Sequence, residues 1–121
     1  MLDRRRILIV EDEALIAAYI LDAVERADGE PVGPAATVAE ALALLDSQDV
    51  HAAILDVHLF DCEVTPVAHR LLAAGKPVVF HTASAVPPEI TARHGEVAIC
   101  PKPSPPTTVV RILAELINGA G

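Results

Sequence analysis

The chain has 121 residues, and nine Lys and Arg against 17 Asp and Glu give it a formal net charge of −8. This length fits one domain, which we expect over residues 1–121 with its core at about 6–118, and it leaves no room for a second catalytic domain. The acidic balance argues against direct binding of nucleic acid, and the 52% hydrophobic content excludes a disordered chain.

Short apolar runs alternate along the chain with apolar residues at helical spacing. The first half contains a strand at 7–10, a helix at 16–27 stopped by Gly29, a weak edge strand at 31–34, and a helix at 38–45 behind a Thr37–Glu40 capping box. The second half contains a strand at 52–55, a helix at 64–72, a strand at 78–81, a short helix opened by Pro87, a strand at 97–100, and a helix from 105 to 117 capped by Ser104. This alternation predicts a parallel α/β sheet with helices on both faces.

The two cysteines, Cys62 and Cys100, lack the spacing of a metal site. We interpret them as reduced thiols of a cytoplasmic protein. No apolar stretch approaches the ~20 residues that a membrane span needs, so no contact with a membrane is expected.

Polar residues follow the predicted strands at the points where ligands bind in open α/β sheets. Glu11 and Asp12 follow the first strand, Asp56 the third, Thr82 the fourth, and Lys102 the fifth. Three carboxylates close together repel one another, and oxygen-only ligands suit Mg²⁺ or Mn²⁺. A metal, a nucleophilic carboxylate, an ammonium and a hydroxyl together suit phosphoryl transfer to an aspartate.

Each of these residues also has a simpler interpretation. The acids at 11–13 can favour a helix start, and Asp56 can belong to a turn. Thr82 fits a strand end, and Lys102 fits a solvated surface. The phosphoryl-transfer hypothesis therefore depends on the conjunction, because each residue ends a different strand at the same edge of the sheet.

The chain resembles the response regulator receiver family of two-component signalling. The resemblance runs from Ile7 to about Ile117 and is carried by Ile-Val-Glu-Asp-Glu at 9–13, Ile-Leu-Asp-Val-His-Leu at 54–59, Phe-His-Thr-Ala at 80–83 and Pro-Lys-Pro at 101–103. The runs at 32–42 and 56–68 are similar to a receiver subgroup that often stands alone, without an output domain. The family implies a flavodoxin-like (βα)5 sandwich with strand order 2-1-3-4-5.

The resemblance implies a role for each strand-end residue. Asp56 accepts a phosphoryl group from a sensor histidine kinase or a phosphotransfer protein. Glu11, Asp12, Asp56 and the backbone carbonyl of His58 hold Mg²⁺, and Lys102 contacts the phosphoryl oxygens. The His58 side chain influences how long the phosphoryl group persists, or it is simply a solvated loop residue.

Other positions are implied to modulate the switch. Thr82 reorients toward the phosphoryl group, Ala83 replaces the glycine of an F-x-T-G motif and leaves space, and Ser84 influences the phosphoryl lifetime. A cis peptide bond precedes Pro103. Ile99 stands where an aromatic switch residue is usual, and its alternative interpretation is a core residue.

The implied output is a protein-interaction surface made of the fourth helix, the fifth strand and the last helix. A downstream protein partner would read it, and a homodimer through the last helix is a further option. We expect no enzyme activity beyond self-phosphorylation and self-dephosphorylation. Two alternatives stay open: a haloacid-dehalogenase-like phosphatase, which would need an acid where His58 stands, and a pseudo-receiver that is never phosphorylated.

Overall fold

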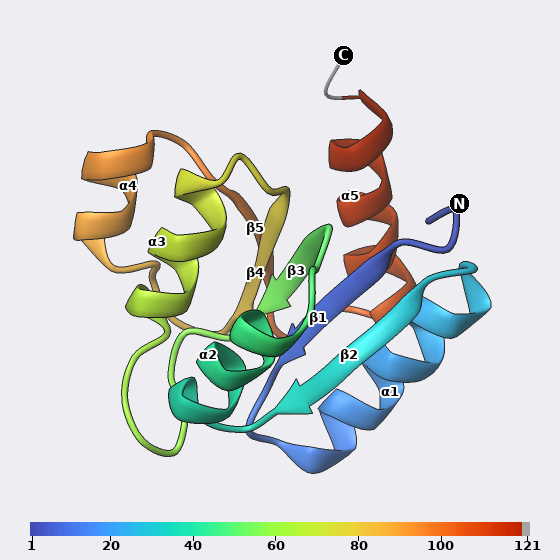
Figure 1. Ribbon diagram of the computed structural model, residues 1–121, viewed down its shortest axis with the longest axis horizontal. Coiled ribbons are helices and arrows are strands. Elements are labelled where there is room, and N and C mark those ends of the chain that lie inside the picture. Colours follow the sequence, from blue (N-terminus) through green and yellow to red (C-terminus); the bar gives the residue numbers. More distant parts are fainter. Residues whose placement is uncertain (120–121) are drawn as a thin grey trace.

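The computed structural model describes residues 1–119, so residues 120 and 121 of the predicted domain lie outside it. Five strands and five helices alternate along the described chain (Figure 1). Their bounds are β1 Arg6–Val10, α1 Ala14–Arg26, β2 Glu30–Ala35, α2 Val38–Ser47, β3 Ala52–Leu55, α3 Thr65–Ala73, β4 Val78–Thr82, α4 Pro88–His94, β5 Ala98–Pro101 and α5 Pro106–Gly119. None of the described helices is long and apolar enough to cross a membrane.

All neighbouring strands pair in parallel, in the order β2-β1-β3-β4-β5. This order confirms the predicted flavodoxin-like α/β fold, with β2 as an edge strand. Figure 1 shows α1 and α5 on one face of the sheet and α2, α3 and α4 on the other. The strand arrows point away from the N-terminus, so the carboxyl ends of the strands lie together at one end of the sheet. Residues that follow the strands collect there.

The central strands are buried on both faces, as their continuous apolar runs predict. Successive side chains of β1 alternate between two core layers. Ile7 and Ile9 pack in the layer that includes residues of α1 and α5, whereas Leu8 and Val10 pack in the layer that includes residues of α2 and α3. Phe80 of β4 is fully buried in the second layer, which fixes the position of this strand's end.

The end of α1 confirms the predicted stop at Gly29. The Gly29 N–H donates to the Val24 carbonyl at 2.9 Å, and Asp28 takes the left-handed conformation with φ 66°. A Cβ atom at Gly29 would lie 2.7 Å from a methyl carbon of Leu2 and 2.8 Å from one of Val24. Only glycine therefore lets the chain turn here against the core.

The predicted cap of the last helix is wrong. α5 begins at Pro106, and the Pro105 carbonyl accepts from the N–H groups of Thr108 at 2.9 Å and Val109 at 3.3 Å. The Ser104 hydroxyl instead donates to the Pro101 carbonyl. The reason is that this bond engages the Ser104 hydroxyl at the end of β5, and the two prolines that follow offer it no N–H.

Candidate functional site

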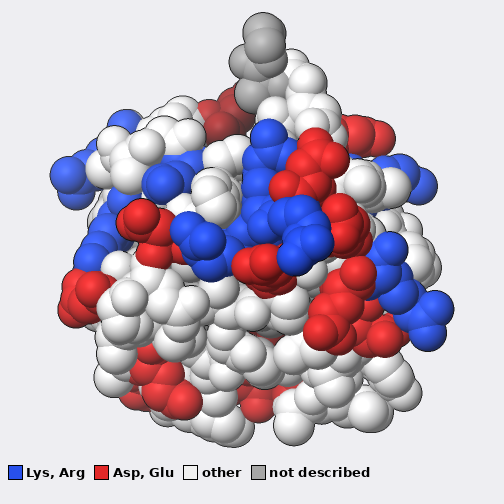
Figure 2. Space-filling view, turned by 45° about the vertical axis from the view of Figure 1, so that its right-hand side comes forward, with Lys and Arg blue, Asp and Glu red and all other residues white. Residues whose placement is uncertain are grey.

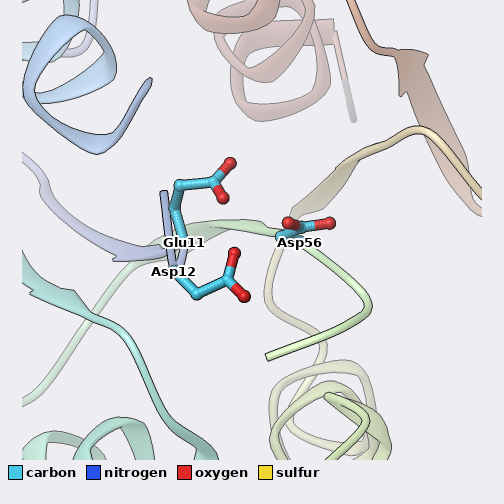
Figure 3. Close-up of side chains that lie close together, drawn as sticks. All are labelled: Glu11, Asp12 and Asp56. Carbon is cyan, nitrogen blue, oxygen red and sulfur yellow. The ribbon is translucent and has the colours of Figure 1, made fainter. Parts of the chain in front are cut away.

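Three carboxylates converge at the edge where the strands end (Figure 3). Glu11 and Asp12 follow β1, and Asp56 follows β3; the two strands pair in register through Val10 and Leu55. Each of the three acids offers one oxygen atom, and these atoms all lie within 4.8 Å of one another. Glu11 is 3% exposed and Asp56 is 7% exposed, so two of the three charges are largely withdrawn from water.

Lys102 brings a positive charge into this cluster. Its Nζ atom lies 2.9 Å from Asp56 Oδ2, 2.8 Å from Glu11 Oε1 and 3.3 Å from Glu13 Oε2. Burial alone would lower the pKa of Lys102, but the carboxylates of Glu11 and Asp56 outweigh it and raise the pKa above its ordinary value. A backbone hydrogen bond positions this lysine, because the main-chain N–H of Lys102 donates to the Thr82 carbonyl at 3.0 Å.

Glu11 is the acid of the cluster whose charged form is disfavoured by burial. Burial raises its pKa to about 7, and the charge of Asp56 raises it too, whereas Lys102 and the backbone N–H of Glu13 lower it. Glu11 Oε1 lies 2.8 Å from the Lys102 ammonium, so the lysine is the group that compensates the charge of this buried oxygen.

A divalent cation fits this donor set. It would add positive charge beside the buried Glu11 and relieve the repulsion between three close carboxylates. Oxygen donors alone match the preference of Mg²⁺ or Mn²⁺ rather than Zn²⁺. Glu11, Asp12 and Asp56 are thus the residues that could hold the predicted metal.

Asp56 itself is held by backbone contacts. Its N–H donates to the Val10 carbonyl at 2.9 Å, and its Oδ1 accepts from the Val57 N–H at 2.7 Å. The other oxygen, Oδ2, faces the Lys102 ammonium. The carboxylate is therefore oriented, with one oxygen toward the backbone and the other toward a fixed cation.

Comparison with known proteins assigns this arrangement to a family. No protein-family model matches the chain, and no curated protein matches it by sequence. Solved structures do match. The chain is 40% identical to SdrG from Sphingomonas melonis Fr1, with a TM-score of 0.78 over 97% of this chain and 99% of that one. It is 27% identical to a CheY-like response regulator receiver domain protein from Methanospirillum hungatei JF-1, with a TM-score of 0.81 over 95% and 94%.

The chain belongs to the response regulator receiver family. It also matches the response regulator PhyR from Brucella abortus at 31% identity and a TM-score of 0.75, over 98% of this chain but 51% of PhyR. Receivers are typically signalling phosphoacceptors rather than enzymes in the usual sense.

The hydroxyl of Thr82 in this receiver faces Ser84. The two side-chain oxygens lie 3.1 Å apart, and the Ser84 N–H donates to Thr82 Oγ1 at 3.1 Å. Thr82 is 3% exposed at the end of β4, whereas Ala83 and Ser84 are exposed. The hydroxyl is therefore held by its own loop and not by Asp56.

Ile99 and the His58 side chain lie on the surface, as do Ala83 and Ser84. Ile99 is 50% exposed, so its interpretation as a core residue is wrong. The reason is that β5 is an edge strand, and the short α4 leaves this side chain uncovered. The His58 side chain is exposed, with Nδ1 3.8 Å from Glu63 Oε2, which agrees with its interpretation as a solvated loop residue. The peptide bond before Pro103 is cis, as the resemblance implies.

Three residues near the site were not predicted. The sequence indicates Glu13 only as an acid at a helix start, yet its carboxylate reaches Lys102. Asp61 lies in the loop after β3 and contacts the start of α2. His81 is 4% exposed beside the site, and both its ring nitrogens lack a hydrogen-bond partner among the described residues. Burial lowers the pKa of His81, and so does Lys102, whereas Asp56 raises it.

Proposed function

We propose that Asp56 accepts a phosphoryl group from the phosphohistidine of a sensor kinase or a phosphotransfer protein, with Mg²⁺ or Mn²⁺ bound. One observation carries this proposal. Asp56 contributes an oxygen to the carboxylate cluster with Glu11 and Asp12, while its Oδ2 lies 2.9 Å from Lys102 Nζ. The same carboxylate thus adjoins a metal ligand set and a fixed ammonium, which are the two charges that phosphoryl transfer requires.

The transfer is a displacement at phosphorus. A carboxylate oxygen of Asp56 forms the new bond to phosphorus while the bond to the donor's imidazole nitrogen breaks, and that nitrogen keeps the electron pair. Glu11, Asp12, Asp56 and the His58 carbonyl would hold Mg²⁺, which would supply positive charge for the phosphoryl oxygens. Lys102 exchanges part of its contact with the carboxylates for a contact with a phosphoryl oxygen.

The added group carries a charge of about −1.5 to −2. In the proposed response, the Thr82 hydroxyl leaves Ser84 and donates to a phosphoryl oxygen, and the small Ala83 leaves room for this turn. Lys102, fixed before Pro103, would follow the same charge. The change would reach the surface of α4, β5 and α5, where Ile99 is exposed, and bias it between two states that a downstream protein reads.

The setting proposed for this domain follows from the family. Residues 1–121 would act as one receiver domain, in the cytoplasm. Its partners would be proteins rather than nucleic acid or membrane, and a second copy docked through α5 is one option.

The test is labelling by acetyl phosphate in the presence of Mg²⁺, followed by mass spectrometry of the intact chain. The wild type should gain one phosphoryl group, and Asp56→Asn should gain none. Asp46→Asn is the matched control, because Asp46 lies on the surface of α2 and pairs with Arg70. It should label like the wild type.

Other outcomes would favour the alternatives. Undiminished labelling of Asp56→Asn would exclude Asp56 as the acceptor. Steady release of phosphate from phosphate esters would favour the phosphatase hypothesis. A wild type that neither labels nor binds Mg²⁺ would be a pseudo-receiver.

A further inference from the structure

The loop between β3 and α3 is a small hairpin. The Val64 N–H donates to the Val57 carbonyl at 2.9 Å, and His58 pairs with Glu63 in an antiparallel bridge. Asp61 therefore lies at the tip of this hairpin. One arm of the hairpin contains the His58 carbonyl, which is the backbone ligand proposed for the metal.

The carboxylate of Asp61 joins the hairpin tip to the start of α2. Oδ1 accepts from the Val38 N–H at 2.8 Å, and Oδ2 accepts from the Ala39 N–H at 3.1 Å. Oδ1 also accepts from the Cys62 N–H at 3.0 Å, within the hairpin. These backbone bonds, that of Val38 first, lower the pKa of Asp61, so the carboxylate stays charged near neutral pH.

The start of α2 has its own cap as well. Thr37 Oγ1 accepts from the Glu40 N–H at 3.1 Å, as the capping box predicts, and the Thr37 carbonyl accepts from the Ala41 N–H at 3.1 Å. Asp61 takes the two N–H groups that Thr37 leaves. The two residues thus share one helix start, and the Asp61 side chain connects it to the loop beside the phosphoacceptor, next to a longer backbone bond from the Phe60 N–H to the Ala36 carbonyl at 3.5 Å.

The segment from 56 to 61 is fixed at both ends. At its beginning, the Asp56 N–H donates to the Val10 carbonyl at 2.9 Å, and at the tip Asp61 bonds to α2. Between them Leu59 is packed into the core, whereas Phe60 is 74% exposed and cannot hold the tip by burial. The bonds of Asp61 to α2, at 2.8 and 3.1 Å, are therefore the shorter polar contacts that secure the hairpin tip, and the Phe60 N–H adds a longer one to the Ala36 carbonyl at 3.5 Å.

We propose that Asp61 is a positioning residue that holds the β3–α3 hairpin on α2, so that the His58 carbonyl is fixed beside Asp56 for the metal. This inference rests on the proposed function, because it assumes that the carbonyl is a metal ligand. Groups that orient metal ligands change metal affinity although they do not touch the ion.

The test measures Mg²⁺ affinity by calorimetry and labelling by acetyl phosphate at a fixed, sub-saturating Mg²⁺ concentration. Asp61→Ala should weaken Mg²⁺ binding about tenfold and reduce labelling, and saturating Mg²⁺ should restore the labelling. Asp61→Asn keeps one acceptor oxygen in the same shape and should lie between the wild type and Asp61→Ala. It also serves if Asp61→Ala does not fold.

The matched control is Thr37→Ala. This variant loses a cap on the same helix without touching the hairpin, so it should bind Mg²⁺ like the wild type. Equal Mg²⁺ affinity in the wild type, Thr37→Ala and both Asp61 variants would overturn the positioning role while leaving the proposed function intact. Equal weakening by Thr37→Ala and Asp61→Ala would also overturn it, because general loosening of α2 would then suffice. A wild type that does not bind Mg²⁺ would overturn the proposed function and this inference with it.

Discussion

His69 of α3 and His94 of α4 share one hydrogen bond, with 2.8 Å between Nδ1 of the first and Nε2 of the second. Burial lowers the pKa of His94, and the neighbouring charges of His69 and Arg93 lower it further. A lowered pKa means that the folded state prefers the neutral ring. The contribution of His94 to stability is therefore present above its unfolded pKa of about 6.5 and lost as the pH falls through its lower folded pKa.

We expect the wild type to lose stability relative to His94→Gln when the pH falls from 8 to 5.5. Glutamine can occupy a similar place but takes up no proton, so it removes this one titration. The measurement is the free energy of unfolding of both proteins in urea at pH 8 and at pH 5.5. The quantity compared is how the difference between the two proteins changes from one pH to the other. A difference that stays constant across this range would contradict the assignment of the pH effect to His94.

The residues predicted from the sequence and those missed differ in how they are brought together. Asp56 and Lys102 were found because strands that run in parallel end at one edge, which the order of the elements dictates. Glu13, Asp61 and the pair formed by His69 and His94 depend instead on contacts between loops and helices. Lys102 lies 89 positions from Glu13, and no periodic pattern links such positions.

Among the elements, α4 depends most on its neighbours. Its seven residues are too few to form a stable helix alone. Its fully buried Ile90 packs in the core, and Glu89 accepts from the Thr65 hydroxyl at 3.3 Å at one end while His94 bonds to α3 at the other. An element fixed by so few contacts can open while the sheet stays folded.

Ile90→Ala should therefore open α4 locally rather than weaken the whole fold. Amide hydrogen exchange should speed up in residues 88–94, with little change in α5. Leu113→Ala is the control, because Leu113 is equally buried but belongs to a long helix packed on the sheet. It should reduce the global free energy of unfolding by about 2–5 kcal/mol. Uniformly faster exchange in Ile90→Ala would show that α4 does not open separately.

The boundaries of elements were less predictable than their order. The strands β1, β3 and β4 are predictable because buried parallel strands are continuous apolar runs, whereas β2 is indicated only weakly, as an edge strand framed by prolines. Thr82 nevertheless belongs to β4, and α5 starts at Pro106 rather than at Pro105. Ends of elements are decided by single hydrogen bonds, such as that of Ser104 with Pro101, which the apolar pattern does not record.

At the scale of the whole molecule, the charge of −8 is unevenly compensated. On the face shown in Figure 2, basic side chains lie directly against acidic ones. The N-terminal half contributes ion pairs of Arg4 with Glu30, Arg5 with Asp3, and Arg26 with Asp22. At the candidate site, by contrast, Glu11, Glu13 and Asp56 contact one lysine, and Asp12 lies close to Glu11 and Asp56, so negative charge is in local excess there.

Divalent cations should therefore stabilise this chain more than ionic strength alone. At about 100 times its Kd, Mg²⁺ bound only to the folded state adds about 2.7 kcal/mol, which raises the Tm of a domain of this size by roughly 10 °C. Thermal unfolding should show this rise with Mg²⁺ and its reversal by a chelator. NaCl at the same ionic strength is the control, because it screens repulsion over the whole surface without binding at one point. Asp12→Asn should reduce the Mg²⁺ effect and leave the NaCl effect unchanged. A Tm that responds equally to both salts would mean that the excess charge is merely screened and that the three carboxylates hold no metal.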